Sequence, residues 1–404
     1  MKNILLLTTF YPNPFREGSP VCYYFVKEWE KMGYNVIVIH YRSMFPKIYL
    51  TMARLFPKMA LKYVGNRIET DIDMNIEEYI HDGTSVYSVP IFKYIPHGKY
   101  SSYTIKNQVK FIENMIDQRN FMPDAIIGHF YNPQLEIISK LKKIYPNAHT
   151  CVSLHEGNPI VIKKLLPKTY DKILSSIDYI GFRSYPIKWK FDKIFGERKK
   201  YVMCFSGTSM TFLETPSTCV RNFTDDKLHN FIYVGQYIAR KYPRVVVEAL
   251  YNVYGSDDFD LYYVGQIEQQ YADVKNFVDI HQLTDHVHYL GQLPRESIIN
   301  AYDKADCFIM ISRYEIFGLV YLEAMARGCI VIASRNEGMD GIIKDGENGF
   351  LCEAGNTQEL QSIIERINNI SGDEKKRISE NGRKTASLLT DNNVAKSYIN
   401  QVIR

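Results

Sequence analysis

Two glutamates eight positions apart are the residues of this sequence best suited to chemistry. Glu315 and Glu323 flank Gly318 in the stretch Glu-Ile-Phe-Gly-Leu-Val-Tyr-Leu-Glu. The pattern predicts a helix that starts near Gly318, with Glu315 just before its first turn and unpaired backbone N–H groups between the carboxylates. Anions bind at such a start, and eight helical residues span about 12 Å. This spacing suits a ligand with a polyhydroxy group at each end and a diphosphate between them, which is the layout of a nucleotide-sugar.

The pair lies inside a longer pattern that runs from Ala305 to Ser334. This stretch resembles the strand, loop, helix and strand block, with its Glu-x7-Glu signature, of the retaining glycosyltransferases numbered family 4, which have two Rossmann-like domains. By this resemblance Glu315 contacts the transferred sugar and Glu323 the ribose hydroxyls. Taken alone, the pair would indicate a carboxylate placed by the helix dipole and a solvated helix residue. The surrounding pattern favours the functional interpretation. Three residues would offer backbone amides to the donor diphosphate: Phe317, Gly318 and Leu319.

A second group of residues follows the apolar run Phe231–Val234 and reads Gly235-Gln236-Tyr-Ile-Ala-Arg240-Lys241. It resembles the family's strand that ends in Gly-Arg-Leu, with a Lys five residues after the Arg, a pair that clamps the donor diphosphate. Lys241 stands at the Lys position. Gln236 replaces the Arg, which removes a permanent cation and a bidentate phosphate partner. Arg240 restores the charge from another direction, whereas without the resemblance Arg240 and Lys241 would be a solvated loop pair.

Three residues of the first half lie where strands are expected to end. His129 and His155 close the segments Ala-Ile-Ile-Gly-His and Cys-Val-Ser-Leu-His, and ligands of parallel sheets bind beyond the carboxyl ends of strands. By the resemblance His155 touches the sugar or the acceptor, and His129 lies on the acceptor side; the alternative is a hydrogen-bonded structural role. Gly18 stands where the family carries a Gly-Gly pair that approaches the donor phosphates or the acceptor, with an ordinary turn as the alternative.

No cofactor or metal is expected. Asp71-Ile72-Asp73 matches the acidic pair with which the other glycosyltransferase fold holds a divalent metal, but no strand leads into it. We therefore expect an exposed acidic loop there, and a leaving diphosphate neutralised by the helix start and Lys241 instead of a metal. The seven cysteines are scattered without a CxxC pair, which predicts reduced core residues of a cytoplasmic protein.

The elements that position these residues are short apolar runs alternating with helical patterns. At 404 residues the chain suits two domains, and continuous apolar strands separated by helices predict parallel sheets covered on both faces. The resemblance implies an α/β fold of the GT-B type, two Rossmann-like domains that face each other across a cleft, with the last helix crossing back to the first domain. The predicted segments are an acceptor domain at 1–204, a linker at 205–228, a donor domain at 229–390 and a C-terminal helix at 391–404. The apolar runs are Ile4–Leu7, Val36–Ile39, Ala125–Ile127, Cys151–Leu154, Tyr179–Gly181, Phe231–Val234, Leu261–Val264, Cys307–Ile311 and Ile330–Ala333.

Charge is distributed unevenly along the chain. Residues 1–200 carry 29 Lys and Arg against 18 Asp and Glu, a net charge of +11, and residues 201–404 carry 20 against 27, a net charge of −7. The segment from Arg42 to Arg67 has basic, aromatic and aliphatic residues and no Asp or Glu. This composition favours contact with an anionic membrane at its inner face, and hence a lipid-linked acceptor. A pair of short helices packed on the first domain is the alternative, because Pro46 and Pro57 interrupt one long helix. We expect no nucleic-acid partner.

These observations together predict a retaining, metal-independent glycosyltransferase that uses a nucleotide-sugar donor. The resemblance places it in the assembly of surface polysaccharide, such as capsule, O-antigen or exopolysaccharide. No strong side-chain base stands out, which fits a front-face mechanism in which the leaving phosphate takes the acceptor proton. An epimerase or a phosphorylase is an alternative on the same scaffold. A non-catalytic nucleotide- or glycan-binding partner of an assembly complex is an alternative of another class, which Gln236 favours.

Overall fold

The structure is a computed structural model, and it describes residues 2–403 except 13–19, 57–58, 60–74, 215–220, 222, 225 and 257. Gly18 and the Asp71-Ile72-Asp73 pattern lie outside the described residues, as does most of the segment between Pro57 and Arg67. The chain divides into two compact units. The first consists of residues 1–183, 190–204 and 395–404, and the second of residues 184–189 and 205–394.

The first unit contains an eight-stranded sheet with the strand order β3-β4-β2-β1-β5-β6-β7-β8. In β1 every residue after Asn3 is buried, as expected for a strand covered by helices on both faces. All neighbouring strands pair in parallel except β3 and β4, which form an antiparallel hairpin. The strands are β1 (Asn3–Thr8), β2 (Asn35–Met44), β3 (Glu77–His81), β4 (Thr84–Phe92), β5 (Ala125–His129), β6 (His149–Leu154), β7 (Tyr179–Phe182) and β8 (Tyr201–Met203).

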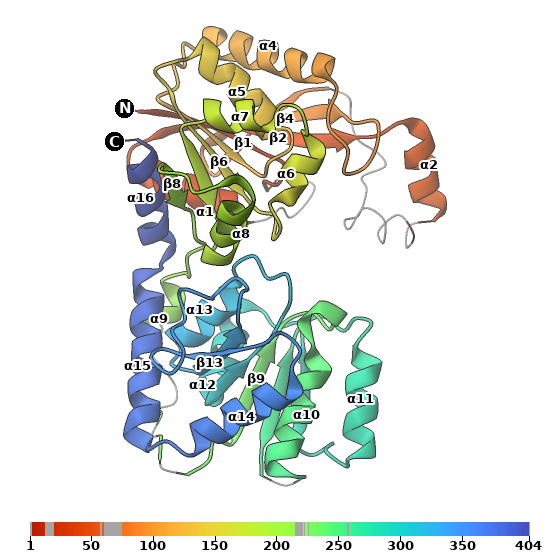
Figure 1. The fold of residues 1–404 in the computed structure, drawn as a ribbon, viewed down its shortest axis with the longest axis vertical. Helices are drawn as coiled ribbons and strands as arrows, with labels where there is room; N and C mark the ends of the chain where they lie inside the picture. Colours follow the sequence, from red (N-terminus) through yellow and green to blue (C-terminus); the bar gives the residue numbers. More distant parts are fainter. Residues whose placement is uncertain are drawn as a thin grey trace. The chain divides into compact units, whose positions relative to one another are not determined.

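Helices lie on both faces of this sheet, with α4, α5 and α7 on one face and α1 on the other (Figure 1). The indole Nε1 of Trp29 in α1 donates to the backbone oxygen of Ala395 in α16 at 3.0 Å, inside the core of the unit. Helices α8 and α16 contribute residues to both units. The helices are α1 (Pro20–Lys31), α2 (Lys47–Leu55), α4 (Ser102–Gln118), α5 (Gln134–Ile144), α6 (Ile160–Leu165), α7 (Tyr170–Ser176), α8 (Tyr185–Phe195) and α16 (Asp391–Val402).

The second unit contains a six-stranded parallel sheet with the order β11-β10-β9-β12-β13-β14. Its strands are β9 (Asn230–Val234), β10 (Asp260–Val264), β11 (Val287–Gly291), β12 (Cys307–Ile309), β13 (Ile330–Ser334) and β14 (Phe350–Cys352). Its helices are α9 (Thr211–Glu214), the 3-10 helix η1 (Ala239–Lys241), α10 (Pro243–Tyr254), α11 (Tyr271–Ile280), α12 (Arg295–Lys304), α13 (Leu319–Ala326), α14 (Thr357–Asn368) and α15 (Gly372–Leu388).

The apolar runs singled out in the sequence lie in strands, except that Cys307–Ile311 extends two residues beyond the end of β12. The expectation of parallel sheets is confirmed apart from one edge. The exception is the β3–β4 hairpin. Its turn, Asp82-Gly83, has φ angles of 47° and 93°, the left-handed conformation that a two-residue hairpin turn requires. In β3 half-buried and exposed residues alternate, so this strand does not have the continuous apolar pattern of a buried one.

Both sheets contain a point at which the strand order reverses. In the second unit the chain moves from β9 outward to β10 and β11, and from β12 in the opposite direction to β13 and β14. In the first unit the same reversal lies between β1 and β5. Open parallel sheets bind ligands beyond the carboxyl ends of the strands at such points. The segments after β9 and β12, and those after β1 and β5, are therefore the first places to look for a site.

Candidate active site

The reversal point of the second sheet brings together two segments that are about seventy residues apart in the sequence. Cys307 and Phe308 of β12 pair in parallel with Phe231 and Ile232 of β9. The chain after β9 continues into η1, and the chain after β12 continues to Glu315. The backbone N–H of Arg313 donates to the backbone oxygen of Arg240 at 2.7 Å, which joins the two segments directly.

Glu315 faces two cations from η1. Its Oε2 lies 3.8 Å from a guanidinium nitrogen of Arg240 and 4.0 Å from Nζ of Lys241, and it accepts a hydrogen bond from the Ser312 hydroxyl at 3.3 Å. The Lys241 side chain is 14% exposed and that of Arg240 is 40% exposed. Burial lowers the pKa of Lys241, while the Glu315 carboxylate acts in the opposite direction. The sequence prediction thus brought together three residues that the structure places in one cluster.

Gly235 and Gln236 stand at the end of β9 beside this cluster. A Cβ on Gly235 would lie 3.2 Å from Nζ of Lys241 and 3.3 Å from Sδ of Met310, so a larger residue would crowd the lysine. The backbone oxygen of Gln236 accepts from the Tyr233 hydroxyl and from the N–H of Ile238. The side chain of Gln236 is exposed and forms no hydrogen bond with other described residues. It therefore leaves this position without a cation.

Helix α13 begins where the sequence predicted. Gly318 is its N-cap with φ +88°, and a Cβ there would lie 2.4 Å from the ring of Tyr321. Glycine is therefore required for both conformation and space. The Tyr321 hydroxyl donates to the backbone oxygen of Met310 at 2.7 Å, which ties the helix start to the end of β12. The N–H groups of Leu319 and Val320, in the first turn, have no acceptor within the helix and are suited to an anion.

The other predicted residues of this helix differ in their surroundings. The side chain of Phe317 is 3% exposed and stacks on Phe205 at 5.6 Å between ring centroids, so it packs in the core and only its backbone is available to a ligand. Glu323 is half-buried in α13, where it accepts from the hydroxyl of buried Tyr302 at 3.3 Å. That hydroxyl also bonds the backbone oxygen of Val320.

Glu337 is a neighbour of Glu315 that the sequence reasoning missed. Its Oε2 accepts from the backbone N–H of Glu315 at 3.0 Å, and the N–H of Gly338 donates to the backbone oxygen of Glu315 at 2.9 Å. A Cβ on Gly338 would lie 2.4 Å from the Phe317 backbone oxygen, so the two loops pack backbone to backbone. The available signal was position, because Glu337 follows β13, whose carboxyl end is beside that of β12.

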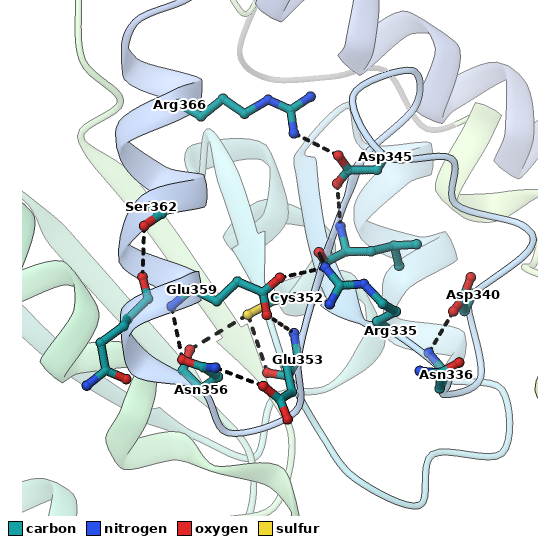
Figure 2. Close-up of polar contacts among 12 residues, drawn as sticks. Arg335, Asn336, Asp340, Asp345, Cys352, Glu353, Asn356, Glu359, Ser362 and Arg366 are labelled. Carbon is teal, nitrogen blue, oxygen red and sulfur yellow. Dashed lines mark hydrogen bonds and ion pairs between the residues drawn. The ribbon is translucent and has the colours of Figure 1, made fainter.

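The loop that carries Glu337 is anchored by its polar neighbours (Figure 2). Arg335 pairs with Glu359 of α14, and the N–H of Asn336 donates to the carboxylate of Asp340 at 2.6 Å. Asp345 accepts from the N–H of Leu351 at 2.9 Å. These contacts fix the loop on both sides of Glu337, so its carboxylate is held next to Glu315.

His129 and His155 form a pair in the first unit. Nδ1 of His129 lies 2.9 Å from Nε2 of His155. His129 is fully buried, with an exposed fraction of 0%, so it lies behind His155 and has no surface of its own for an acceptor. Burial and the Arg183 guanidinium lower the pKa of His129 to about 3 and that of His155 well below its usual range. Both rings are neutral at physiological pH.

The residues around His155 hold it in one place. Phe130, with φ +72°, stacks on the His155 ring at 4.1 Å. The carboxylate of Glu156 accepts from the N–H of His155 at 3.1 Å, and burial raises the pKa of Glu156 to about 8. The strand-end position singled out both residues of the pair, but their mutual contact was not visible in the sequence.

Two searches of the described residues were negative. No group of three or more His, Cys, Asp and Glu side chains in that part of the chain is arranged to hold a metal ion. None of the helices it contains is both long enough and apolar enough to span a bilayer.

Comparisons with known proteins agree with this geometry. Residues 220–385 match the family model of glycosyl transferases group 1. An uncharacterized glycosyltransferase from Methanocaldococcus jannaschii is 26% identical over 357 residues, which cover 83% of this chain and 93% of that protein. The solved structure of trehalose-6-phosphate from E. coli bound with UDP-2-fluoro glucose has a TM-score of 0.68 at 11% identity, with 100% of this chain and 99% of that one covered. Anabaena Alr3699/HepE in complex with UDP and glucose has a TM-score of 0.63 at 14% identity, with 99% of each chain covered. These likenesses show a GT-B fold of two Rossmann-like α/β domains.

Proposed function

We propose that this chain, whose residues 220–385 match the glycosyl transferases group 1 model, is a retaining glycosyltransferase that moves a sugar from a nucleotide-sugar donor to a glycan or lipid-linked glycan in surface polysaccharide biosynthesis. The observation that carries the proposal is the contact of Glu315 with Arg240 and Lys241 beside the start of α13. A carboxylate for a sugar, two cations and a helix start for a diphosphate lie at one reversal point of a parallel sheet.

The proposed reaction needs no side-chain base. The acceptor hydroxyl oxygen bonds to the anomeric carbon on the face from which the diphosphate leaves, the bond between that carbon and the diphosphate oxygen breaks, and the hydroxyl proton passes to a phosphate oxygen. Lys241, Arg240 and the backbone amides of Gly318, Leu319 and Val320 at the start of α13 stabilise the charge that develops on the diphosphate, without a metal. Glu315 positions the sugar.

The remaining predicted residues take supporting parts in this proposal. Glu323 contacts the ribose hydroxyls, Gly235 keeps the space for Lys241, and His155 contacts the sugar or the acceptor. The two solved structures named above contain UDP or a UDP-sugar, which supports a nucleotide-sugar as the donor here.

The second candidate function is that of a non-catalytic nucleotide- or glycan-binding partner of an assembly complex. The side chain of Gln236 favours it, because it is exposed and has no partner in the described part of the chain, whereas a cation at that position would strengthen the hold on a leaving diphosphate. Under this hypothesis the site binds a nucleotide-sugar and no bond is broken.

A screen of nucleotide-sugars tests the proposal. Purified protein is heated with UDP-, GDP-, ADP- and dTDP-sugars, and the release of nucleoside diphosphate is followed. We expect one donor to raise the melting temperature and to be hydrolysed slowly. Glu323→Ala should lose the stabilisation, and Glu315→Gln should lose the hydrolysis. Glu380→Gln, on the exposed face of α15, is the control and should behave as the wild type.

The outcomes separate the two candidates. Stabilisation without product, in the presence of every acceptor tried, would favour the binding partner. Stabilisation by none of the donors, or equal behaviour of Glu315→Gln and Glu380→Gln, would reject the proposed site.

Membrane contact through α2 is the remaining part of the proposal. Ile48, Met52 and Leu55 are spaced four and three residues apart and are 70%, 43% and 65% exposed, so they form one apolar stripe. Lys47 and Arg54 of the same helix are also exposed. An apolar stripe next to basic residues suits the surface of an anionic bilayer, to which each basic residue contributes about 1 kcal/mol.

Sedimentation with phosphatidylglycerol vesicles tests this contact. We expect the double variant Lys47→Glu/Arg54→Glu to lose most of the binding, and Ile48→Ser/Leu55→Ser to weaken it. Lys106→Glu/Lys110→Glu makes the same charge change on exposed positions of α4 and should bind as the wild type. Equal loss in both charge-reversal variants would show that net charge, and not α2, governs the binding.

A further inference from the structure

The hydrogen bond between His129 and His155 has a direction, because one ring donates and the other accepts. The proposed mechanism does not use this direction. Two neutral imidazoles whose nitrogens lie 2.9 Å apart share one hydrogen between the facing atoms, so one ring donates and the other accepts. If His129 donates, His155 accepts at Nε2 and keeps its own proton on Nδ1. If His155 donates, its Nδ1 is a bare acceptor. The direction therefore decides whether His155 offers a donor or an acceptor to a ligand.

The far side of His129 contacts the C-terminal helix. Its Nε2 lies 3.5 Å from the hydroxyl of Tyr398 in α16, and that hydroxyl lies 3.6 Å from Sγ of Cys151. Phe25 packs against both His129 and Tyr398, with ring centroids 5.6 Å and 5.3 Å apart. The polar atoms of this cluster thus have few partners and are enclosed by apolar groups.

The strongest donor and the strongest acceptor of this cluster set the direction of the hydrogen bond between His129 and His155. A phenolic hydroxyl is a good donor, an unprotonated imidazole nitrogen is a good acceptor, and a thiol is weak in both roles. The Tyr398 proton is therefore better placed on the bond to Nε2 of His129 than on the bond to sulfur. His129 then carries its proton on Nδ1 and donates it to His155.

The outer nitrogen of His155 is the one left for a ligand. Nδ1 of His155 has no hydrogen-bond partner among the described residues. It is also not among the fully buried polar atoms of these residues that lack a partner, so it is not enclosed by the protein. Besides Tyr398 and Cys151, two of the described charged or titratable groups face the pair: Arg183, whose positive charge opposes protonation of both rings, and Glu156, whose carboxylate accepts from the backbone N–H of His155. A neutral ring held in one orientation can form a directed hydrogen bond.

We propose that His129 is a positioning residue, which together with Tyr398 fixes His155 as the Nδ1–H tautomer, so that His155 donates a hydrogen bond to a hydroxyl or phosphate oxygen of the substrate. The part that concerns the substrate rests on the proposed function. In this arrangement His155 is a donor and not a general base, in agreement with a reaction in which the leaving phosphate takes the acceptor proton.

Nitrogen-15 NMR of the histidine side chains of the whole protein tests the tautomer without any substrate. The signals of His129 and His155 are assigned by their loss in single variants. We expect His155 to be protonated at Nδ1 in the wild type. His129→Asn, which keeps an N–H donor at about the place of Nδ1, should preserve this state, whereas His129→Leu should give a mixture of both tautomers.

Two results would overturn the proposal. One is protonation of Nε2 of His155 in the wild type, which needs no variant to fold. The other is an unchanged His155 tautomer in folded His129→Leu.

Turnover with the donor found in the screen tests the link to the reaction. We expect kcat to fall about tenfold in His129→Leu and to recover in His129→Asn, with KM for the donor changed less than twofold. Tenfold in rate is about 1.4 kcal/mol, which is on the scale of one lost hydrogen bond. Unchanged kcat in a His129→Leu protein with a mixed tautomer would reject the catalytic part. If no donor is turned over, the proposed function is rejected, but the NMR measurement still tests the tautomer of His155 independently.

Discussion

Glu315 holds two cations near the start of α13 without pairing closely with either. The distances of 3.8 Å to Arg240 and 4.0 Å to Lys241 exceed the usual 2.7–2.9 Å or so of a charge-assisted hydrogen bond. Both cations are therefore available to an incoming diphosphate at small cost. Glu315 in turn has its backbone fixed by Glu337 and Gly338, so its carboxylate does not need the cations for its position.

The two cations should not be equivalent. Lys241 is the more buried, and an interaction in a less hydrated place contributes more to the stabilisation of developing charge. We expect Lys241→Met to lower kcat about a hundredfold, on the scale of losing one preorganised donor, and Arg240→Met to lower it about tenfold. The measurement is donor turnover at saturating donor, with Arg240→Lys as the variant that keeps the charge.

The ionic strength dependence separates the two residues further. Because Arg240 is 40% exposed, salt should screen its contribution to kcat. The difference in kcat between the wild type and Arg240→Met should therefore shrink at high salt, whereas the difference between the wild type and Lys241→Met should persist. Equal losses that respond equally to salt would mean that burial does not rank these cations.

The start of α13 depends on Gly318. This residue combines φ +88° with a space that the Tyr321 ring fills. Gly318→Ala should destabilise the second unit by about 1–3 kcal/mol for the backbone conformation, and by more for the clash. The control is Gly255→Ala at the end of α10, where φ is +73° and nothing lies within 4 Å of the added Cβ. Urea unfolding compares the two, and a Gly318→Ala protein no less stable than Gly255→Ala would show that Tyr321 moves freely.

At the level of elements, the sequence predicted the strands that have a regular apolar pattern and missed the features that depend on packing between distant segments. Nine strands were found because parallel strands covered on both faces are continuous apolar runs: β1, β2, β5, β6, β7, β9, β10, β12 and β13. No run was singled out for β4, β8, β11 or β14. The β3–β4 hairpin was missed because its edge strand β3 is only half-buried and because Ser and Pro residues interrupt the apolar pattern of the buried strand β4. The cluster of Glu315, Lys241 and Arg240 came from a resemblance, whereas the contact of Glu337 with Glu315 depends on the packing of two loops, which no spacing in the sequence records.

The same limit applies to the histidines. A strand end was enough to single out His129 and His155 as candidates, but burial of a polar ring is settled by the helices that cover it. The α16 residue that closes over His129 is Tyr398, 269 residues away in the chain. No local pattern could have assigned the inner and outer positions of the pair.

For the whole molecule, the last ten residues belong to the first unit although the preceding helix turns belong to the second. Removing residues 395–404 would leave the Trp29 indole without its acceptor. It would also expose the apolar side chains of the first unit that pack on the removed segment. We expect the first unit to lose at least the 1–3 kcal/mol or so of one unsatisfied buried donor. Hydrogen exchange measured by mass spectrometry should show faster exchange in β1 and β5 of the truncated protein.

The second unit and a point variant serve as the controls for this truncation. Exchange in β9 and β12 should change little, because their core lies within the second unit. Asn400→Ala, on the exposed face of α16, should exchange as the wild type. Equal acceleration in both units would contradict a role of the segment specific to the first.

The stability of the first unit should also depend on pH in two opposite ways. His129, with a folded pKa of about 3, and His155 stay neutral in the fold. Below about pH 6.5, the unfolded chain takes up protons at both histidines that the folded chain does not, so acid lowers stability. Glu156, with a folded pKa of about 8, keeps a proton that the unfolded chain releases above its ordinary value of 4.5. Its contribution is complete below pH 4.5 and is lost as the pH rises through 8.

These signs predict a stability maximum near pH 6.5. As the pH falls from 8 to 6.5, only Glu156 changes the free energy of unfolding, and it raises it. As the pH falls further from 6.5 to 4.5, the two histidines lower the free energy of unfolding while Glu156 still raises it. The net effect is that of one proton, a loss of about 1.4 kcal/mol per pH unit. His129→Asn should remove one of the two histidine contributions and leave the acid limb nearly flat. The unit is followed by the fluorescence of buried Trp29 during urea unfolding, with Trp189, which is 45% exposed, replaced by Phe. An acid limb of the same slope in His129→Asn would mean that His129 is protonated in the fold, and the neutral pair on which the direction of the His129–His155 bond depends would have to be abandoned.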